Sequence, residues 1–203
     1  MAKALAELLD EGVTGRYVLV RSDLNVPLKD GVVTDDGRVR ASLPVIEKLA
    51  KAGARVIVTA HLGRPKGQVD PQYSIAPAAA RLAELASVPV KVATDLVGED
   101  AKAKAADLKD GEVLVLENVR YDARETSKDD AERGAFADEL VALTGKNGAY
   151  VDDAFGAVHR KHASVYDVAK RLPAYLGDLV KKEVDVLSKA LNNPERPFVV
   201  VMG

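Results

Sequence analysis

The sequence predicts an α/β fold in which helices cover both faces of a six-stranded, mostly parallel sheet. Six short runs rich in valine carry this prediction: Tyr17–Val20, Arg55–Thr59, Val90–Ala93, Val113–Leu116, Ala149–Val151 and Phe198–Val201. Most are separated by longer segments with helical periodicity, an alternation that is typical of parallel strands buried on both faces. The 203 residues, 47% of them hydrophobic, suffice for a large core. We therefore expect a three-layer α/β/α, Rossmann-like domain.

The first helix signal lies between the first two runs. Apolar residues recur at helical spacing from Leu43 to Ala50, and Gly53 is expected to end this helix. Pro44 would then lie in the first turn, where a missing N–H costs little.

Three further helix starts follow along the chain. Ser74 with Pro77 can open a helix after the second run. The triplet 98–100, Gly-Glu-Asp, places acidic side chains at the start of a shorter helix. Ser127-x-x-Asp130 is a variant of the capping box and predicts another helix start.

The carboxy-terminal part of the chain combines a long helical stretch with a last apolar run. The stretch from about Ala174 to Leu191 reads as a helix that packs on the domain or leads out of it. The run Phe198–Val201 then predicts a buried strand close to the last residue, Gly203. An apolar strand is an unusual terminus, so we expect the sequence to be a fragment of a longer protein.

The overall composition excludes several classes of partner. The net charge of −2 and pI near 6.0 give no global field that attracts nucleic acid or an anionic membrane. The chain contains no Cys and its first residues lack the apolar stretch of a signal peptide, so a cytoplasmic location is expected. Its apolar runs are too short to span a bilayer.

Charged and polar side chains gather after four of the expected strands. In an open parallel sheet, ligands bind outside the carboxyl ends of the strands. The residues at these ends are Arg21, Asp23 and Asn25, then His61 and Arg64, then Arg120, and finally His159, Arg160 and His162. Arg offers planar, bidentate donors that fit phosphate or carboxylate oxygens. This pattern in a slightly acidic chain predicts a pocket for a small, highly charged anion.

Each of these residues alone also has an ordinary structural explanation. A single Arg after a strand is usually solvated or paired with a carboxylate, and histidines are commonly structural. Asp23 can form a turn by accepting hydrogen bonds from nearby N–H groups, or it can accept one from a substrate hydroxyl while Arg21 offsets its charge. Asp152 and Asp153 could suggest a metal site, but such a pair more often binds backbone or Arg, and no metal site is predicted.

The sequence lacks the signatures of several enzyme classes. There is no G-x-G-x-x-G after the first strand, no G-x-x-x-x-G-K-[ST], no G-x-S-x-G and no Cys nucleophile. The segment 144–148, "TGKNG", has the wrong spacing for a phosphate loop. A dinucleotide fold, a P-loop nucleotidase and a Ser or Cys hydrolase therefore lose support.

Five segments, in this order, closely resemble the phosphoglycerate kinase family. They are "VLVRSDLNVPL", "DDGRVRASLPVIEKL", "VTAHLGRPKG", "VLENVRY" and "DDAFGAVHRKHAS". The resemblance spans nearly the whole chain and implies an amino-terminal, 3-phosphoglycerate-binding domain at residues 1–173, an interdomain helix at 174–192, and the last strand at 193–203. It implies that a carboxy-terminal nucleotide-binding domain would follow.

The resemblance also implies roles for individual residues. Those matching Asp23 and Asn25 hold the glycerate part of the substrate. A basic patch surrounds its phosphate and carboxylate, and it consists of Arg38, His61, Arg64, Arg120 and Arg160. Arg38, which is expected to precede a helix, is assigned the catalytic role of stabilising the phosphoryl group in flight. Arg21 is counted with the substrate-binding residues because of its place after the first strand, and His159 and His162 are possible members of the pocket.

The implied reaction of the family is transfer of a phosphoryl group between 1,3-bisphosphoglycerate and ADP, giving 3-phosphoglycerate and ATP in glycolysis. Because the acceptor in the reverse direction is an ionised carboxylate, positioning and charge stabilisation suffice, without a general base. Mg²⁺ with ADP or ATP would be held by the full-length enzyme and not by these residues, so the chain alone is expected to be inactive. It is also expected to be a monomer. One alternative is a stand-alone module that binds phosphate or carboxylate or serves as a scaffold. Another is a complete small phosphatase or sugar-phosphate enzyme, for which the sequence shows no nucleophile or metal cluster.

Overall fold

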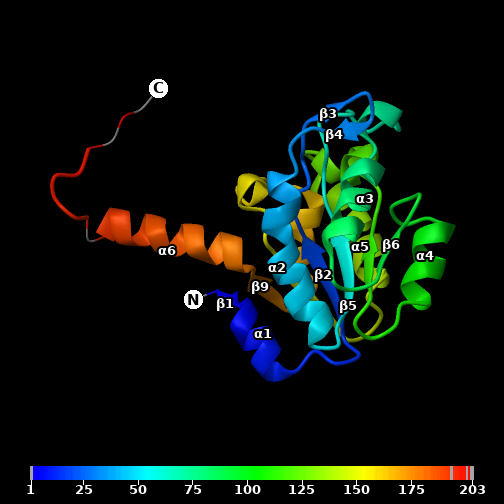
Figure 1. Ribbon diagram of the computed structural model, residues 1–203, viewed down its shortest axis with the longest axis horizontal. Coiled ribbons are helices and arrows are strands. Elements are labelled where there is room, and N and C mark those ends of the chain that lie inside the picture. Colours follow the sequence, from blue (N-terminus) through cyan, green and yellow to red (C-terminus); the bar gives the residue numbers. More distant parts are fainter. Residues whose placement is uncertain (1, 193, 200, 202–203) are drawn as a thin grey trace.

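A seven-stranded parallel sheet forms the centre of the molecule in the computed structural model, which describes residues 2–192, 194–199 and 201 (Figure 1). The strand order is β1-β9-β8-β2-β5-β7-β6, and every neighbouring pair recorded is parallel. The strands are β1 (Lys3–Ala4), β2 (Tyr17–Arg21), β5 (Arg55–Thr59), β6 (Val90–Val92), β7 (Val113–Val115), β8 (Gly148–Asp152) and β9 (Ala174–Leu176). A small antiparallel ribbon pairs β3 (Leu28–Lys29) with β4 (Val32–Val33).

Helices cover both faces of this sheet. They are α1 (Leu5–Glu11), α2 (Gly37–Lys51), α3 (Ala76–Leu85), α4 (Glu99–Ala106), α5 (Asp130–Ala142) and α6 (Asp178–Asn192). Val18 and Val20 of β2 belong to the core cluster that includes residues of α1, α2 and α3. Leu19, which points the other way, belongs to the cluster formed with α4 and α5. The two clusters lie on opposite faces of the sheet, each covered by helices, so the predicted three-layer α/β/α class is confirmed.

Five of the six predicted strands are present within two residues of their predicted ends. Of the sixth, Phe198–Val201, Val200 lies outside the described residues and the other three are not in a strand. Phe198, Val199 and Val201 lie in coil and are 41%, 79% and 92% exposed, and Figure 1 shows their segment well away from the sheet. A strand needs a hydrogen-bonded neighbour, which these residues lack among the described part of the chain. The sheet has seven strands rather than the predicted six because it contains β1 and β9 in addition to the five confirmed strands. These two strands are too short to show the period-two pattern in the sequence.

The stretch predicted as a helix from Ala174 begins as a strand. Tyr175, 2% exposed, pairs with Val151 in the sheet, and Gly177 separates this strand from α6. The first turn of α6 is fixed by the Asp153 carboxylate, whose Oδ1 accepts a hydrogen bond of 2.8 Å from the backbone N–H of Leu179. The helix therefore starts where the residue after β8 supplies an acceptor for one of its free N–H groups.

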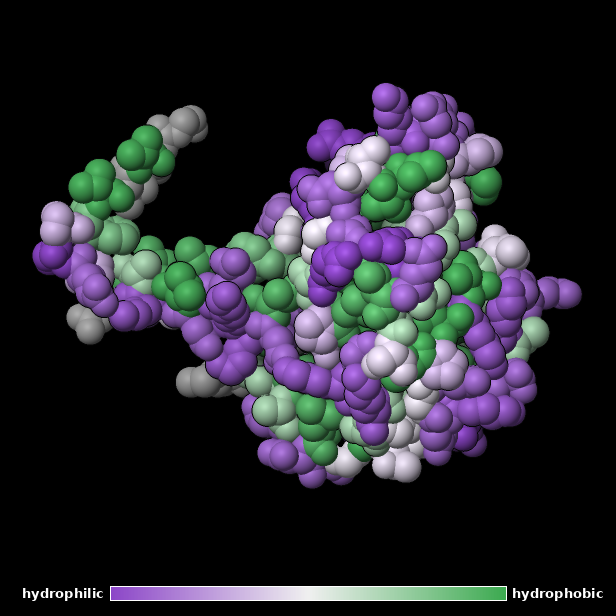
Figure 2. All heavy atoms as spheres, viewed as in Figure 1, coloured by the Kyte–Doolittle hydropathy of each residue, from purple (hydrophilic) through white to green (hydrophobic). Residues whose placement is uncertain are grey.

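Helix α6 extends from the sheet and carries several exposed apolar residues (Figures 1 and 2). The exposed side chains are Val184, Val186, Leu187 and Leu191. Within the described residues, no helix is both long enough and apolar enough to cross a membrane.

Two predicted helix starts need correction. Helix α2 begins at Gly37, so that Pro44 lies in its interior, on the exposed side where the unbonded carbonyl of the preceding turn can reach water. Helix α5 is capped by Asp129 rather than by Ser127: the Asp129 carboxylate accepts from the N–H groups of Ala131 and Glu132 at 2.7 and 3.2 Å. Pro77 and the acidic first turn of α4 lie at helix starts, as predicted.

Candidate anion-binding site

A cavity of about 610 Å³ opens at the carboxyl edge of the sheet. The parallel register brings the ends of three central strands to one level, because Arg21 of β2 is opposite Thr59 of β5 and Asp152 of β8. The segments that follow these strands therefore converge. Eight residues selected from the sequence line the cavity: Asp23, Asn25, Arg38, His61, Arg64, Arg120, Arg160 and His162.

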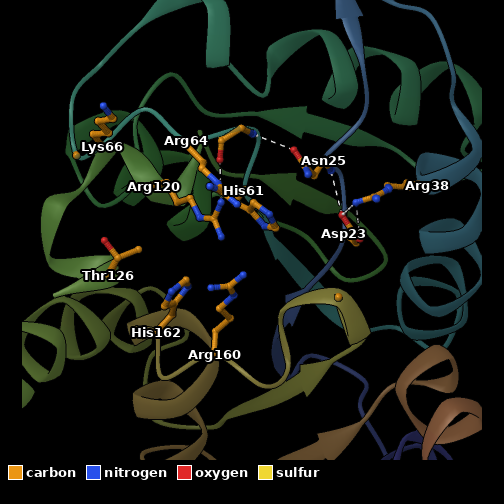
Figure 3. A pocket seen from close by; sticks show the side chains of 13 residues that line it. Asp23, Asn25, Arg38, His61, Arg64, Lys66, Arg120, Thr126, Arg160 and His162 are labelled. Atoms are coloured by element: carbon orange, nitrogen blue, oxygen red, sulfur yellow. Dashed lines mark hydrogen bonds and ion pairs between the residues drawn. The ribbon is translucent and has the colours of Figure 1, made fainter. Parts of the chain in front are cut away.

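The cavity is strongly basic although the chain as a whole is slightly acidic. Its lining contains five cationic side chains, Arg38, Arg64, Lys66, Arg120 and Arg160, against the single carboxylate of Asp23. Figure 3 shows Arg160 and His162 facing Arg64, Arg120 and His61 across the space. Among the described residues, only Arg38 of these five cations forms an ion pair, and that pair is with Asp23. The other four are available to an anion.

The Asp23 carboxylate contacts both Arg38 and the backbone of Asn25 at one end of the cavity. Nη1 of Arg38 lies 3.0 and 2.9 Å from the two carboxylate oxygens of Asp23. One of these oxygens also accepts from the backbone N–H of Asn25 at 3.1 Å. The Asp23 carboxylate thus forms the turn that follows β2 and holds Arg38, which lies in the first turn of α2 and not ahead of the helix as expected.

The loop after β5 is held against the cavity by contacts around Gly63. The side-chain oxygen of Asn25 accepts from the Gly63 N–H at 2.8 Å, and Arg120 donates to the Gly63 carbonyl at 2.8 Å. Gly63 has φ of +61°, and a Cβ there would lie 2.3 Å from the ring of Tyr73. Both observations require glycine at this position.

Asn118 fixes the geometry of Arg120. Its side-chain oxygen accepts from the backbone N–H groups of Leu62 and Arg120, and its amide donates to the carbonyls of Leu62 and Tyr73 at 2.7 Å. Asn118 is fully buried, so these bonds satisfy the whole amide. Burial and the neighbouring Arg21 lower the pKa of Arg120, which is the effect expected of a partly buried cation close to other cations.

The two histidines of the cavity are neutral at physiological pH. Burial, together with Arg21 and Arg120, lowers the pKa of His61 to about 2. Burial and the same two arginines lower the pKa of His162 to about 4. Neither ring adds charge to the cavity, and each can offer a hydrogen bond from a neutral imidazole.

Two of the residues selected from the sequence do not line the cavity. Arg21 is the last residue of β2 and is completely buried behind the cavity wall, where it contacts His61, Ser22 and Ser164. His159 is exposed to solvent on the same segment as Arg160.

The structure adds Lys66 and Thr126 to the lining. Lys66 follows the Gly-Arg-Pro segment directly, so its place in a basic loop could have indicated it. Thr126 lies in a segment without any motif and gives no sequence signal. Gly67, with φ of +75°, approaches Ala123 so closely that a Cβ would lie 2.6 Å from that residue's Cβ, and this packing brings the two segments together.

The acidic pair at the end of β8, Asp152 and Asp153, has structural partners. Asp152 accepts from the N–H of Ala154 at 3.0 Å, and Asp153 accepts from Leu179 of α6. Over residues 2–192, 194–199 and 201, no group of three or more His, Asp or Glu side chains is placed to hold a metal ion. Both carboxylates of this pair thus accept hydrogen bonds from backbone N–H groups.

The fold and the cavity together define an α/β domain with a strongly basic cavity at the carboxyl edge of its parallel sheet. The family model described as phosphoglycerate kinase matches residues 8–203. The chain belongs to the phosphoglycerate kinase family.

Relatives of known name agree with this assignment. The chain is 73% identical over 199 residues to phosphoglycerate kinase of Paenarthrobacter aurescens (strain TC1), covering 98% of this chain and 49% of the relative. It is 62% identical over 202 residues to phosphoglycerate kinase of Nocardia farcinica (strain IFM 10152), covering 99% and 49%. The chain spans about half the length of the curated relatives it matches.

Solved structures show the same fold. The crystal structure of phosphoglycerate kinase from Pyrococcus horikoshii OT3 superposes with a TM-score of 0.81 at 32% identity, covering 97% of this chain and 47% of that one. The structure of phosphoglycerate kinase from Coxiella burnetii gives a TM-score of 0.75 at 34% identity, covering 92% and 45%.

Proposed function

We propose that this chain supplies the 3-phosphoglycerate site of a phosphoglycerate kinase. The observation that carries the proposal is the cavity in which Arg64, Lys66, Arg120 and Arg160 have no carboxylate partner among the described residues. A phosphate and a carboxylate on one small molecule would satisfy these cations by charge-assisted hydrogen bonds. Asp23 and Asn25, at one end of the same cavity, would bind the glycerate hydroxyl between the two charged groups.

The proposed reaction is phosphoryl transfer between 1,3-bisphosphoglycerate and ADP, in which Arg38 stabilises charge on the transferred group. Arg38 is paired with Asp23, so a ligand hydroxyl that bonds Asp23 would also release Arg38 toward the phosphoryl group. The nucleotide, Mg²⁺ and the carboxy-terminal domain that would bring them are proposed to come from the part of a full-length kinase that relatives contain beyond this chain. A role in glycolysis, a cytoplasmic location and a monomeric state stay predictions.

Binding of 3-phosphoglycerate tests the proposal directly. Calorimetry with the 203-residue chain should show saturable binding, and amide shifts should change around Arg38, Arg64, Arg120 and Arg160. Glycerol 3-phosphate, which lacks the carboxylate, is the matched control and should bind more weakly. Shifts that gather at the amino edge of the sheet, or equal affinity for the two ligands, would contradict this assignment.

A further inference from the structure

Arg21 makes a set of contacts that the proposed substrate site does not explain. Its side chain is completely buried, Nη1 donates to the carbonyl of Ser22 at 2.8 Å, and Nε donates to Oγ of Ser164 at 3.0 Å. Nη2 lies 3.0 Å from Nδ1 of His61. The guanidinium is thus fixed on three sides and faces the back of the His61 ring rather than the cavity.

This contact determines where His61 carries its proton. A guanidinium only donates hydrogen bonds, so Nδ1 of His61 must accept from Arg21 and must be unprotonated. A neutral imidazole in that state has its proton on Nε2. Because His61 lines the cavity and its Nδ1 faces Arg21, we expect the opposite edge of the ring, which carries Nε2, to face the cavity.

Arg21 is in turn held by a buried hydroxyl and a buried carboxylate. Oγ of Ser164, which accepts from Arg21, donates to Oε1 of Glu125 at 2.7 Å, and the backbone N–H of Ser164 donates to Oε2 at 2.9 Å. Ser164 and Glu125 are both completely buried. Hydrogen bonds therefore connect four separate segments of the chain, in the order Glu125, Ser164, Arg21 and His61. The series ends at the Nδ1 edge of the His61 ring.

We infer that this series of hydrogen bonds fixes His61 as a neutral Nε2–H donor toward the bound anion, and that Arg21, Ser164 and Glu125 are positioning residues that act through His61. The inference deepens the proposed function and rests on it only for the identity of the anion. In this view Arg21 does not contact the substrate and affects binding only through His61.

The charges around His61 support this assignment. The groups that face it are Arg21 from β2, Arg120, Arg38 from α2 and His162, and the first three are cations. A proton on Nδ1 would point at Arg21 and find no acceptor. Burial raises the pKa of Glu125 to about 7, and a protonated Glu125 could still donate to Ser164 while Ser164 accepts from Arg21. The bond between Arg21 and His61 is thus compatible with both states of Glu125.

The protonation state can be measured in the ligand-free chain. Long-range ¹H–¹⁵N correlation spectra of the histidine rings, assigned with His61→Asn and His162→Asn, should show His61 with an unprotonated Nδ1 and a protonated Nε2. From pH 8 to pH 5 the ring should not take up a second proton, and any smaller change as Glu125 titrates should leave Nδ1 unprotonated. A proton on Nδ1, or a titration of this ring near pH 6.5, would overturn the inference.

Ser164→Ala tests the positioning role, with Thr144→Ala as its control. Thr144 is also a buried hydroxyl, but it donates to Val141 near the amino edge of the sheet. Ser164→Ala should mix the two tautomers of His61 and weaken 3-phosphoglycerate on the order of fivefold, the effect of about one ordinary hydrogen bond. Thr144→Ala should change neither. A folded Ser164→Ala chain with the native ring spectrum and native affinity would contradict the role.

Glu125→Gln provides a second variant that keeps the shape of the buried group. Its amide oxygen can still accept from the N–H of Ser164, so the variant should fold and should shift the His61 signals in the same direction as Ser164→Ala, by less. An unchanged ring spectrum in Glu125→Gln would remove Glu125 from the series. Failure of 3-phosphoglycerate and sulfate to bind the wild-type chain would defeat the proposed function, whereas the ring spectrum of the free chain supports or overturns the inference by itself.

Discussion

Asp23 and Arg38 share one ion pair at the end of the cavity, although the proposed function gives them different partners. Side chains of Asp23 and Arg38 are 22% and 53% exposed, so solvent screens the pair and it contributes little to stability. The ion pair matters more for how the cavity binds an anion. The pair keeps a carboxylate inside a basic cavity from repelling an anion as strongly as a free Asp would.

Replacement of Asp23 by Asn separates the substrate role from the structural role. The amide cannot accept from a ligand hydroxyl as strongly as a carboxylate, so 3-phosphoglycerate should bind about tenfold more weakly. Sulfate, which has no hydroxyl, should bind no more weakly than to the wild type, because the variant frees Arg38. Calorimetry with both ligands measures the difference, and an equal loss for both, or a drop of several kcal/mol in unfolding free energy, would favour a purely structural Asp23.

A pH dependence of stability is expected from Asp153, which is 1% exposed. Burial, with the nearby carboxylates of Asp178 and Asp152, raises its pKa to about 7 from the ordinary 3.8. Between these values the folded chain holds a proton that the unfolded chain releases, so this group adds stability as the pH falls, by at most about 1.4 kcal/mol per pH unit. The contribution is complete below about pH 4 and is lost as the pH rises through 7.

Urea unfolding of the wild type and of Asp153→Asn at about pH 7.5, 6 and 5 checks this expectation. The free energy of unfolding of the wild type should rise relative to the variant at each step toward lower pH. A difference that is constant over the range, or that shrinks on acidification, would show that Asp153 is ionised in the folded chain.

The sequence predicted most of the cavity residues because parallel strands end at one edge. Arg38 was found only through the resemblance, since it lies on a helix rather than after a strand. Arg21 shows what the rule misses: side chains alternate along β2, so Arg21 points to the same face as Leu19 and away from the cavity. A pattern of residue types cannot fix where a strand ends to within one residue, and that one residue decides the direction of the side chain.

At the level of elements, the loop from His61 to Gly67 couples backbone shape to the cavity. Gly63→Ala should lose about 2–4 kcal/mol of stability, because the left-handed φ and the contact with Tyr73 both oppose a Cβ. Affinity for 3-phosphoglycerate should fall on the order of tenfold, since Arg120 and Asn25 both bond Gly63.

Gly145→Ala is the matched control for this loop. Gly145 has φ of +62°, close to that of Gly63, but no atom lies within 4 Å of its Cβ position. It should lose only about 1 kcal/mol and leave ligand affinity unchanged. If the two variants unfold at the same urea concentration, contact with Tyr73 does not constrain the loop.

The segment that carries Arg160 and His162 is anchored by a buried ion pair. Arg133 of α5, 1% exposed, donates from Nε to Asp167 at 2.9 Å and also pairs with Asp130, which in turn binds Lys161. Asp167→Asn should cost about 3–5 kcal/mol of unfolding free energy, because it leaves a buried guanidinium short of a counter-ion. Asp185→Asn, which breaks the exposed pair with Lys181 on α6, should cost less than about 1 kcal/mol. If Asp167→Asn and Asp185→Asn lost similar amounts of unfolding free energy, the buried ion pair between Arg133 and Asp167 would not anchor this segment.

The elements themselves were predicted where a long periodic pattern existed. Strands β2 and β5 and the apolar face of α2 follow from valine runs and from helical spacing. The three-residue β9 was assigned to a helix because Tyr175 and Leu176 fit either period, and only pairing with β8 distinguishes them. The start of α5 depends on which of two nearby polar side chains reaches the free N–H groups, which is a matter of loop geometry.

For the whole molecule, we expect the 203-residue chain to bind 3-phosphoglycerate without transferring a phosphoryl group from ATP. Transfer requires donor and acceptor to be held in line, and such positioning can contribute about 7–11 kcal/mol of the barrier. A coupled assay on protein freed of host kinase should give the background rate, and addition of a separately produced carboxy-terminal half should restore activity if the two associate. Turnover by the chain alone that disappears in Arg38→Ala would contradict this expectation.

The order of the strands has a consequence for how the chain acquires its structure. The central strand β2 pairs with β5, but its other neighbour, β8, begins at Gly148, and the first strand β1 finds its partner only at Tyr175. Contacts so distant along the chain are typical of slow folding, because a long loop must close before they form. During synthesis, at about 5–20 residues per second, β8 would begin to leave the ribosome roughly 6–25 seconds after β2. The basic cavity, whose walls lie on both sides of β2, would therefore be among the last features to form, and a nascent chain should gain affinity for its anion only after Asp152 has emerged.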